Sequence, residues 1–335
     1  MALTLAAADL FRCPVCGSGL GLVDGEDAMC CEACGHAIAA VDGVLDLVPE
    51  ARRGPERAFY DDYYERAQAA QRPDSLEALA GTWTAPGAPW EMQRVWNRLG
   101  DLRGHTVLLL GNGESHAELY MLTKEPRVLI YSDLSPVGLR ELLGDGELAR
   151  DGSVLFAAID ALDLPLRDES IDLVYGFAFA HHLPDPERFL AEVARVLRPG
   201  GRCVFMDNAY SPIWQWLKLG WLRPLMGLSH RREPRSPEDI RDTMSGGFRE
   251  ERLSEAIRRV GGEPWFERVA FLYYFWKRAS VALFPKVLRV IPRHDLVSTA
   301  LMRIDQFLSR FGWVRRNMIR LIWGFDKPPR HGEER

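Results

Sequence analysis

The chain has 335 residues, of which 47% are hydrophobic and 27% charged, a composition typical of a globular protein. Its net charge of −5 gives no overall attraction for nucleic acid, and its six cysteines do not suggest a disulfide scaffold in a chain of this length. No run of about 18 uncharged apolar residues is present, so no membrane span is predicted. The N-terminus lacks a basic start and carries Asp9, so we expect no signal peptide and a cytoplasmic protein.

Five of the six cysteines lie within residues 13–34. The pairs CPVC (Cys13 and Cys16) and CEAC (Cys31 and Cys34) are separated by fourteen residues, a spacing at which four thiolates can surround one Zn²⁺. Four cysteine ligands leave no open position for water, so the predicted site is structural. Nearby Cys30 and His36 are alternative ligands, and reduced thiols or a redox pair are the alternative interpretations.

The pattern CPVCGSGL…CEACGHAIAAVDGVLDLVPEA resembles the short zinc-ribbon domains related to the small activator subunit of tRNA and release-factor methyltransferases. The resemblance implies a zinc ribbon at 1–50, where a protein partner could bind. Residues 51–98 are charged and contain an aromatic cluster, and we interpret them as a helical linker with lead-in helices.

From residue 99 onward, apolar runs alternate with helical patterns, which predicts βαβ units and a parallel sheet. The segment 263–278 predicts one or two strands that close the sheet, and 280–328 is expected to be helical. The expected strands are Val107–Leu110, Val128–Tyr131, Val154–Ala158, Ile171–Tyr175 and Arg202–Met206.

A glycine turn, Gly111-Asn112-Gly113, directly follows the first of these strands. Such a turn lets a ligand approach the backbone, and the segment after it offers free amides to an anionic group. Asp133 follows Gly113 by twenty residues and ends the next strand, where a carboxylate can accept both hydroxyls of a ribose. Together these features indicate a nucleotide-binding crevice.

The stretches DALDLPLRDESIDLVY and HHLPDPERFLAEVARVLRPGG resemble the class I, Rossmann-like S-adenosylmethionine-dependent methyltransferases of the type 11 group. The resemblance implies an α/β core at 99–278, with a mostly parallel seven-stranded sheet flanked by helices. It also implies that the glycine turn holds the methionine end of the cofactor, that Asp133 takes the ribose, and that Asp160 accepts from the adenine. Phe177 is expected to face the sulfonium. The implied cofactor-binding residues are Gly111, Asn112, Gly113, Glu114, Asp133, Leu134, Asp160, Ala161 and Phe177.

Two positions depart from the family pattern. Leu109 stands where an acidic residue is usual, and Ser115 replaces the third glycine. The cofactor ammonium therefore needs another partner, for which Glu114 and His116 are the candidates. An NAD-dependent dehydrogenase is the competing Rossmann interpretation, but it leaves the Asp160 segment unexplained.

Methyl transfer mainly requires that the acceptor be held on axis, and a hydroxyl acceptor must also lose a proton. The candidate catalytic residues are His182, His181 and Asp207, which follow two strands at the edge where open α/β sheets bind ligands. The alternative is that the histidines pack against or cap a loop, and that Asp207 only caps its strand.

Residues 209–249 form an insertion rich in Trp and Arg that we interpret as a substrate lid. The C-terminal extension, 279–335, is predicted to be basic, aromatic and helical. Between Lys277 and Arg330, twelve basic and three acidic residues give a local charge of +9. This segment fits solvated helices, a peripheral contact with the inner face of a membrane, or an RNA-binding surface.

The sequence thus predicts a methyltransferase that uses S-adenosylmethionine and carries a structural zinc. We expect O-methylation of a small-molecule, glycan or lipid-linked acceptor in biosynthesis. Base methylation of rRNA or tRNA is the alternative enzyme function, and a non-catalytic S-adenosylmethionine-binding regulator is the alternative without chemistry.

Overall fold

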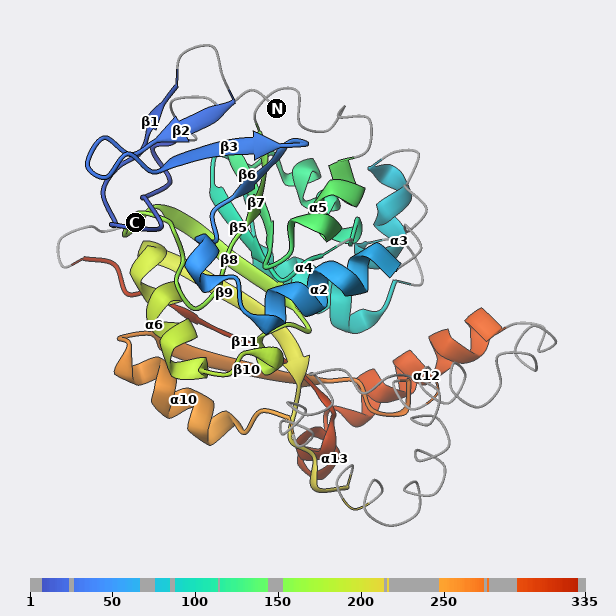
Figure 1. The fold of residues 1–335 in the computed structure, drawn as a ribbon. Coiled ribbons are helices and arrows are strands. Elements are labelled where there is room, and N and C mark those ends of the chain that lie inside the picture. Colours follow the sequence, from blue (N-terminus) through green and yellow to red (C-terminus); the bar gives the residue numbers. More distant parts are fainter. Residues whose placement is uncertain are drawn as a thin grey trace.

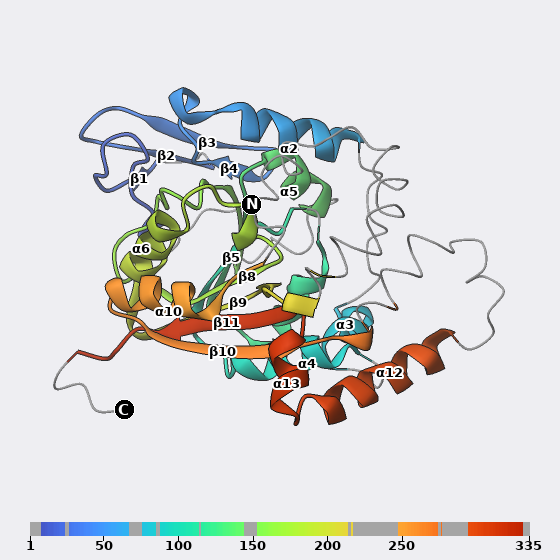
Figure 2. The same ribbon diagram turned by 90° about the horizontal axis from the view of Figure 1, so that it is seen from below.

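A computed structural model provides the structure of the chain. The residues it describes are 8–23, 27–66, 76–84, 88–113, 115–143, 153–213, 216, 247–273, 276 and 294–330. The predicted Rossmann-like α/β fold is confirmed: helices cover both faces of one central sheet (Figures 1 and 2).

Seven strands make up the methyltransferase-like part of the sheet, in the order β7-β6-β5-β8-β9-β11-β10. The first five of these are parallel, and β11 runs antiparallel to both of its neighbours. Parallel strands covered on both faces are typically continuous apolar runs, and β5 to β7 are buried at every position. The strands are β5 (Thr106–Leu110), β6 (Val128–Asp133), β7 (Val154–Ala158), β8 (Ile171–Phe177), β9 (Leu197–Asn208), β10 (Glu263–Val269) and β11 (Arg320–Asp326).

The predicted count of seven strands is wrong for the sheet as a whole, which has eleven strands. The four extra strands come from the N-terminal segment, because β4 pairs in parallel with the edge strand β7. This N-terminal segment, which we call the ribbon, thereby covers the edge of β7, whose backbone groups would otherwise be unpaired. Its strands are β1 (Gly21–Leu22), β2 (Ala28–Cys30), β3 (Ala37–Val41) and β4 (Val44–Asp46).

Two hydrophobic cores lie on opposite faces of the sheet. One contains side chains of α6, α10 and the ribbon, and the other contains side chains of α3, α4, η3 and α5. The helices are η1 (Glu50–Arg52), α2 (Pro55–Arg66), η2 (Glu77–Leu79), α3 (Ala80–Trp83), α4 (Trp90–Leu99), η3 (Ala117–Lys124), α5 (Pro136–Leu143), η5 (Ala180–His182), α6 (Pro186–Val196), α10 (Glu250–Arg259), α12 (His294–Leu308) and α13 (Gly312–Asn317).

The C-terminal segment differs from the prediction at one element. Residues 280–328 are predicted to be helical, and α12 and α13 agree, but Arg320–Asp326 is the strand β11 between β9 and β10. Periodicity does not separate a short buried strand from a buried helix, and here pairing on both sides decides the conformation. The last strand of the sheet thus comes from the segment assigned to the C-terminal extension.

The predicted lid, 209–249, lies outside the described residues apart from its two ends and Trp216. Those ends meet: Ala209 bridges Phe248, and the Tyr210 amide donates to the Phe248 carbonyl at 2.9 Å. The insertion therefore leaves and rejoins the fold at the carboxyl end of β9.

Candidate cofactor and active site

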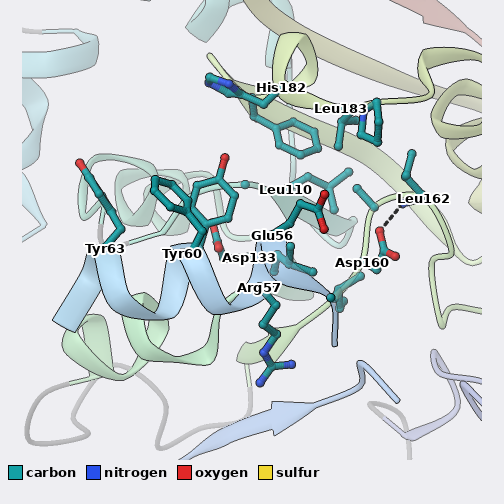
Figure 3. A pocket seen from close by; sticks show the side chains of 18 of the residues that line it. Glu56, Arg57, Tyr60, Tyr63, Leu110, Asp133, Asp160, Leu162, His182 and Leu183 are labelled. Atoms are coloured by element: carbon teal, nitrogen blue, oxygen red, sulfur yellow. Dashed lines mark hydrogen bonds between the residues drawn. The ribbon is translucent and has the colours of Figure 1, made fainter. Parts of the chain in front are cut away.

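A cavity of about 420 Å³ lies at the carboxyl ends of β5, β6, β7 and β8 (Figure 3). The strand order reverses between β5 and β8, which is where open α/β sheets bind their ligands. The volume falls within the range of cofactor pockets. Of the predicted cofactor-binding residues, those that line the cavity are Gly111, Asp133, Leu134, Asp160 and Ala161.

Asp133 is the buried acidic group of this cavity. Its carboxylate accepts the Gly113 amide at 2.9 Å and the Ser135 amide at 3.0 Å. Burial raises the pKa of Asp133 to about 6, against the opposing effect of these amides. The aspartate thus organises the glycine turn, in which Gly111 and Gly113 have φ of +66° and +49°.

Helix α2 covers this turn with aromatic side chains. A Cβ added to Gly113 would clash with the Tyr64 hydroxyl, and Tyr64 hydrogen-bonds Asp133. Phe59, Tyr60 and Tyr63 line the same cavity, and Figure 3 shows Tyr60 and Tyr63 on the helix beside Asp133. These aromatic residues are visible in the sequence, but their spacing alone gives them no part in the site.

The ribbon holds α2 in place through a partly buried ion pair. Arg57 donates to both carboxylate oxygens of Asp46 in β4, at 2.8 and 2.7 Å. The Arg57 side chain is 7% exposed, and the pair lowers the pKa of Asp46 although burial acts against it. Further along α2, Asp61 accepts from the Ser135 hydroxyl near the tip of β6. The N-terminal segment is therefore linked to the cavity by direct contacts.

Asp160 and Ala161 follow β7 and line the cavity. The Asp160 carboxylate accepts the Leu162 amide at 2.9 Å, as the dashed line in Figure 3 indicates. This hydrogen bond fixes one of the two carboxylate oxygens of Asp160. Asp160 follows the end of β7, in agreement with its predicted place at a strand tip.

Phe177, predicted to face the sulfonium, does not line the cavity. It is the last residue of β8, packs with the core on the α4 side of the sheet, and has the Arg320 guanidinium 5.3 Å from its ring. The chain then turns at Ala178, where φ is +52°, and directs Phe179 into the cavity against Gly111. Side chains two apart on a strand share a face, so only this turn sends an aromatic ring to the other side.

The three predicted catalytic residues lie together. The His181 Nδ1 atom is 2.8 Å from the Asp207 carboxylate, which is fully buried and also accepts from the Trp323 indole at 3.0 Å. The His182 ring packs on His181 with centroids 3.9 Å apart and lines the cavity. An aspartate on Nδ1 fixes the orientation and the tautomer of an imidazole. The contact therefore positions His181, and through the packed rings it supports His182 at the cavity wall.

Of the two residues predicted to compensate for Leu109, Glu114 lies outside the described residues. His116 is buried and is not among the residues that line the cavity. Apart from Asp133 and Asp160, the carboxylate on the described cavity wall belongs to Glu56 of α2, which Figure 3 labels.

A fully buried carboxyl group, that of Glu118 in η3, lies behind the turn. It accepts from the Ser115 hydroxyl at 2.6 Å and from Tyr131 at 3.3 Å. Burial raises the pKa of Glu118, although these hydrogen bonds oppose the shift. Ser115, which replaces the third glycine of the family pattern, therefore has a structural contact of its own.

The remaining predicted residues have structural contacts near the turn. Asn112 is buried and its carbonyl accepts the Ser115 amide at 2.9 Å, while Gly113 contributes the amide that Asp133 accepts.

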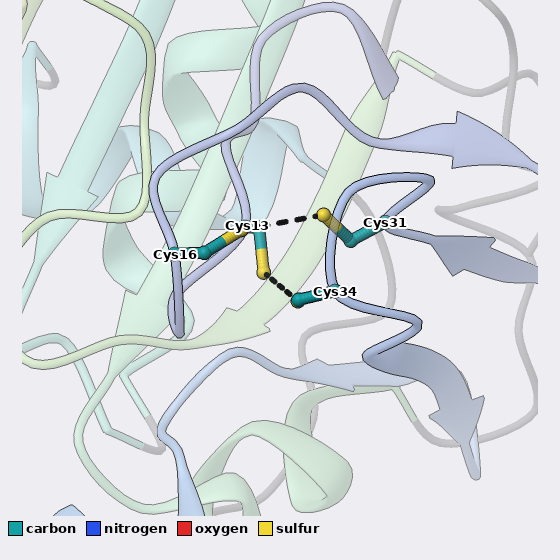
Figure 4. Close-up of side chains that lie close together, drawn as sticks. All are labelled: Cys13, Cys16, Cys31 and Cys34. Carbon is teal, nitrogen blue, oxygen red and sulfur yellow. Dashed lines mark hydrogen bonds between the residues drawn. The ribbon is translucent and has the colours of Figure 1, made fainter.

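The cysteine pairs come together on the ribbon (Figure 4). The sulfur atoms of Cys13, Cys16, Cys31 and Cys34 all lie within 4.8 Å of one another, and the closest approaches are 3.6 Å for Cys13–Cys34 and 3.5 Å for Cys16–Cys31. Tetrahedral Zn²⁺ with Zn–S bonds of about 2.3 Å requires separations of about 3.8 Å, so this set of donors fits the ion. Cys30 points elsewhere, toward the Cys31 carbonyl.

Without a cation, the pKa values of Cys16 and Cys34 move in opposite directions. Hydrogen bonds from Ser18 lower the pKa of Cys16 to about 6. The backbone of His36 lowers the pKa of Cys34, but the neighbouring Cys16 thiol and burial outweigh it and raise this pKa to about 12. Four adjacent thiolates therefore need a metal to balance their charge.

The sheet order, with acidic residues at the tips of β6 and β7 and a glycine turn after β5, defines a class I, Rossmann-like methyltransferase. A family model described as "Methyltransferase domain" matches residues 108–205. The ubiquinone/menaquinone biosynthesis C-methyltransferase UbiE of Acidiphilium cryptum is 31% identical over 196 residues, which cover 54% of this chain and 75% of that protein. The chain belongs to the type 11 family of S-adenosylmethionine-dependent methyltransferases, and S-adenosylmethionine is the cofactor of that family.

Two further similarities are more distant. Methyltransferase GfsG of Streptomyces halstedii is 28% identical over 163 residues, which span 44% of this chain and only 56% of that relative. A solved complex of the Haloferax volcanii Trm112 methyltransferase activator with a methyltransferase is 18% identical, covers 83% of this chain and 99% of that one, and has a TM-score of 0.48.

Proposed function

We propose that the protein transfers a methyl group from S-adenosylmethionine to an oxygen of a small-molecule, glycan or lipid-linked acceptor. The observation that carries the proposal is the cavity itself. It combines Asp133 and Asp160 at successive strand tips with His182 on its wall. The name of the UbiE relative, which refers to the biosynthesis of ubiquinone and menaquinone, supports a small or lipid-like acceptor.

The residues of the cavity fit the cofactor. Asp133 is proposed to accept the two ribose hydroxyls and Asp160 the adenine amine, while Leu134 and Ala161 supply apolar contacts. Phe179, rather than Phe177, is the aromatic side chain suited to the methionine end, because it lies in the cavity against Gly111. When bound, S-adenosylmethionine supplies an electrophilic methyl group on a sulfonium.

The chain's own residues are proposed to take up the proton of the acceptor and to exclude water from the cavity. A hydroxyl acceptor loses its proton as it is methylated, and His182 is proposed to take that proton because it lines the cavity. His181 and Asp207 are proposed as positioning residues: the 2.8 Å contact fixes His181, and the His181 ring supports His182 by packing against it. The tyrosines of α2 keep water away from the same space.

We also propose that Cys13, Cys16, Cys31 and Cys34 bind one structural Zn²⁺. The support is the fit of the sulfur separations to a tetrahedral ion, together with the raised pKa of Cys34, which a bound cation would reverse. The Asp46–Arg57 pair supports a role for the ribbon in holding α2 over the cavity.

The first test is calorimetric binding of S-adenosylmethionine and S-adenosylhomocysteine to the full chain. Binding in the low micromolar range is expected, and no binding by either would overturn the cofactor site. The second test measures formation of S-adenosylhomocysteine with hydroxyl-bearing phenols, sugars and prenylated quinols as acceptors.

The histidine is tested with His182→Gln, which should lower kcat about 10²- to 10⁴-fold, as expected for loss of a general base, and should leave cofactor binding unchanged. Asp207→Asn should shift the pH profile of kcat, whereas a merely structural role would leave that profile unmoved. Turnover with amine or carbon acceptors alone would refute O-methylation without affecting the cofactor assignment.

A further inference from the structure

The helices α12 and α13 extend from the edge of the sheet formed by β10, on the far side from the ribbon (Figures 1 and 2). Asp305 attaches α12 to the body: its buried carboxylate accepts the backbone amides of Phe271, Leu272 and Tyr273 at 2.9, 2.8 and 2.9 Å. Met302, one turn earlier, is buried on the same side. This side of α12 therefore faces the protein.

The outward side of α12 carries large apolar side chains, which a surface helix usually buries. Leu296, Ile304 and Phe307 are 60%, 44% and 54% exposed, and their spacing places them on one helical face. Phe311, in the turn after α12, and Trp313, in α13, are 52% and 68% exposed. Phe307 and Phe311 pack edge to face at 5.7 Å. We call these five exposed residues the outer apolar stripe, and exposed apolar side chains gathered in this way mark an interaction site.

The exposed charged residues within 296–319 are arginines, although Arg315 and Arg316 share a hollow with Glu250, Glu251 and Glu267. Arg303, Arg310, Arg315 and Arg316 are exposed, and the Arg310 guanidinium lies 5.6 Å from the Phe307 ring. Within 296–319 the sole acidic residue is Asp305, whose carboxylate is buried on the backbone. The exposed surface thus joins aromatic and aliphatic side chains to four positive charges.

We propose that the outer apolar stripe binds the surface of a bilayer that contains anionic lipid. Apolar side chains of an interfacial helix enter the boundary between headgroups and acyl chains, and arginines beside them pair with lipid phosphates. A second copy of the chain fits this surface poorly, because two stripes face to face would bring Arg303 and Arg310 of both copies close together. The inference is independent of the methyl-transfer proposal, since none of these residues lines the cofactor cavity.

The mode of contact is peripheral. Among the residues that the structure describes, no helix is both long and apolar enough to cross a membrane. Binding should therefore be reversible and sensitive to salt, because the arginine contribution is screened.

The test is co-sedimentation of the full chain with vesicles. Equal parts of phosphatidylcholine and phosphatidylglycerol should pellet the wild type at low salt, and vesicles of phosphatidylcholine alone should not. Arg303→Gln with Arg310→Gln should lower the partition coefficient about 30-fold, at about 1 kcal/mol for each arginine near the surface. Phe307→Ser with Phe311→Ser should lower it at least tenfold.

Matched controls separate the stripe from general effects. Val41→Ser changes an exposed apolar residue on β3, and Arg252→Gln removes an exposed arginine on α10. Both should pellet like the wild type. The blue shift of tryptophan fluorescence on vesicle binding should disappear in Trp313→Phe, while pelleting is retained.

Three results would overturn the proposal. These are equal binding to neutral vesicles, unchanged pelleting of the double variants, and a dimer in light scattering that Phe307→Ser with Phe311→Ser converts to a monomer. None of them bears on cofactor binding, which calorimetry measures without vesicles.

Discussion

Replacing Asp133 with asparagine tests the cofactor site at its most specific contact. The side chain keeps its size but loses its charge, and one of its two oxygens becomes an NH₂ group. In the wild type, those oxygens accept the amides of Gly113 and Ser135 at 2.9 and 3.0 Å and remain available to the cavity. The asparagine side chain can accept at a single atom and cannot supply the anionic acceptor that a ribose diol favours.

The expected loss follows from these contacts. A hydrogen bond to a charged group contributes about 1.5–3 kcal/mol, so removal of one charged acceptor should raise the Kd for S-adenosylmethionine about 10- to 150-fold. The change also leaves one buried amide poorly paired, which should lower the free energy of unfolding by about 1–3 kcal/mol.

Calorimetric titration with S-adenosylhomocysteine measures the affinity, and near-ultraviolet circular dichroism checks that the variant is folded. Asp101→Asn is the matched control, because Asp101 precedes the amino end of β5, away from the cavity, and accepts the Arg103 amide. A folded Asp133→Asn protein that binds with the wild-type Kd would refute the assignment of the ribose to this residue.

Three further predictions follow from the contacts around the site. Since burial raises the pKa of Asp133 to about 6, cofactor affinity should fall as the pH decreases through 6, and titrations above and below that pH should show this trend in the wild type but not in Asp133→Asn. The free energy of unfolding of the unliganded protein should change with pH in the opposite direction. The Asp133 carboxyl contributes stability that is fully present below its usual pKa of 3.8 and is lost as the pH rises through 6. Measurements of Tm against pH detect this change. Arg57→Met should loosen α2 and raise the Kd for S-adenosylhomocysteine several-fold, whereas Arg53→Met, which breaks a more exposed contact with the same carboxylate, should leave it within a factor of about two. Metal analysis should find one zinc per chain. The Cys31→Ser variant should lose the zinc and have a Tm lower by several degrees, while the neighbouring Cys30→Ser variant should retain the zinc. Zinc-free wild-type protein with an unchanged Tm would contradict the site.

Local patterns were sufficient for much of the candidate site. The apolar runs that became β5 to β9 are continuous because parallel strands are covered on both faces, so periodicity and turn residues predicted them. Asp133, Asp160 and the glycine turn occupy positions relative to strand ends that can be counted along the chain. The cysteine pairs are recognisable for the same reason, since each pair sits in a short turn whose geometry depends on a few adjacent residues.

Other parts of the site depend on contacts between distant segments. The tyrosines of α2 reach the cavity because Arg57 is held by Asp46 of the ribbon, a pairing that no spacing predicts. Phe179 rather than Phe177 enters the cavity because the backbone turns at Ala178, where a positive φ reverses the face.

The amino-acid sequence by itself determined the class of fold, the strands of the core, the acidic residues at their tips and the cysteine cluster, since each is a property of neighbouring residues. Only the tertiary structure decided that the ribbon would extend the sheet through β4 and β7, that 320–326 would be a strand, and that an apolar face of α12 would point outward. The physical reason is that these outcomes depend on which partners are available across the fold, and burial and pairing with distant segments outweigh local preference.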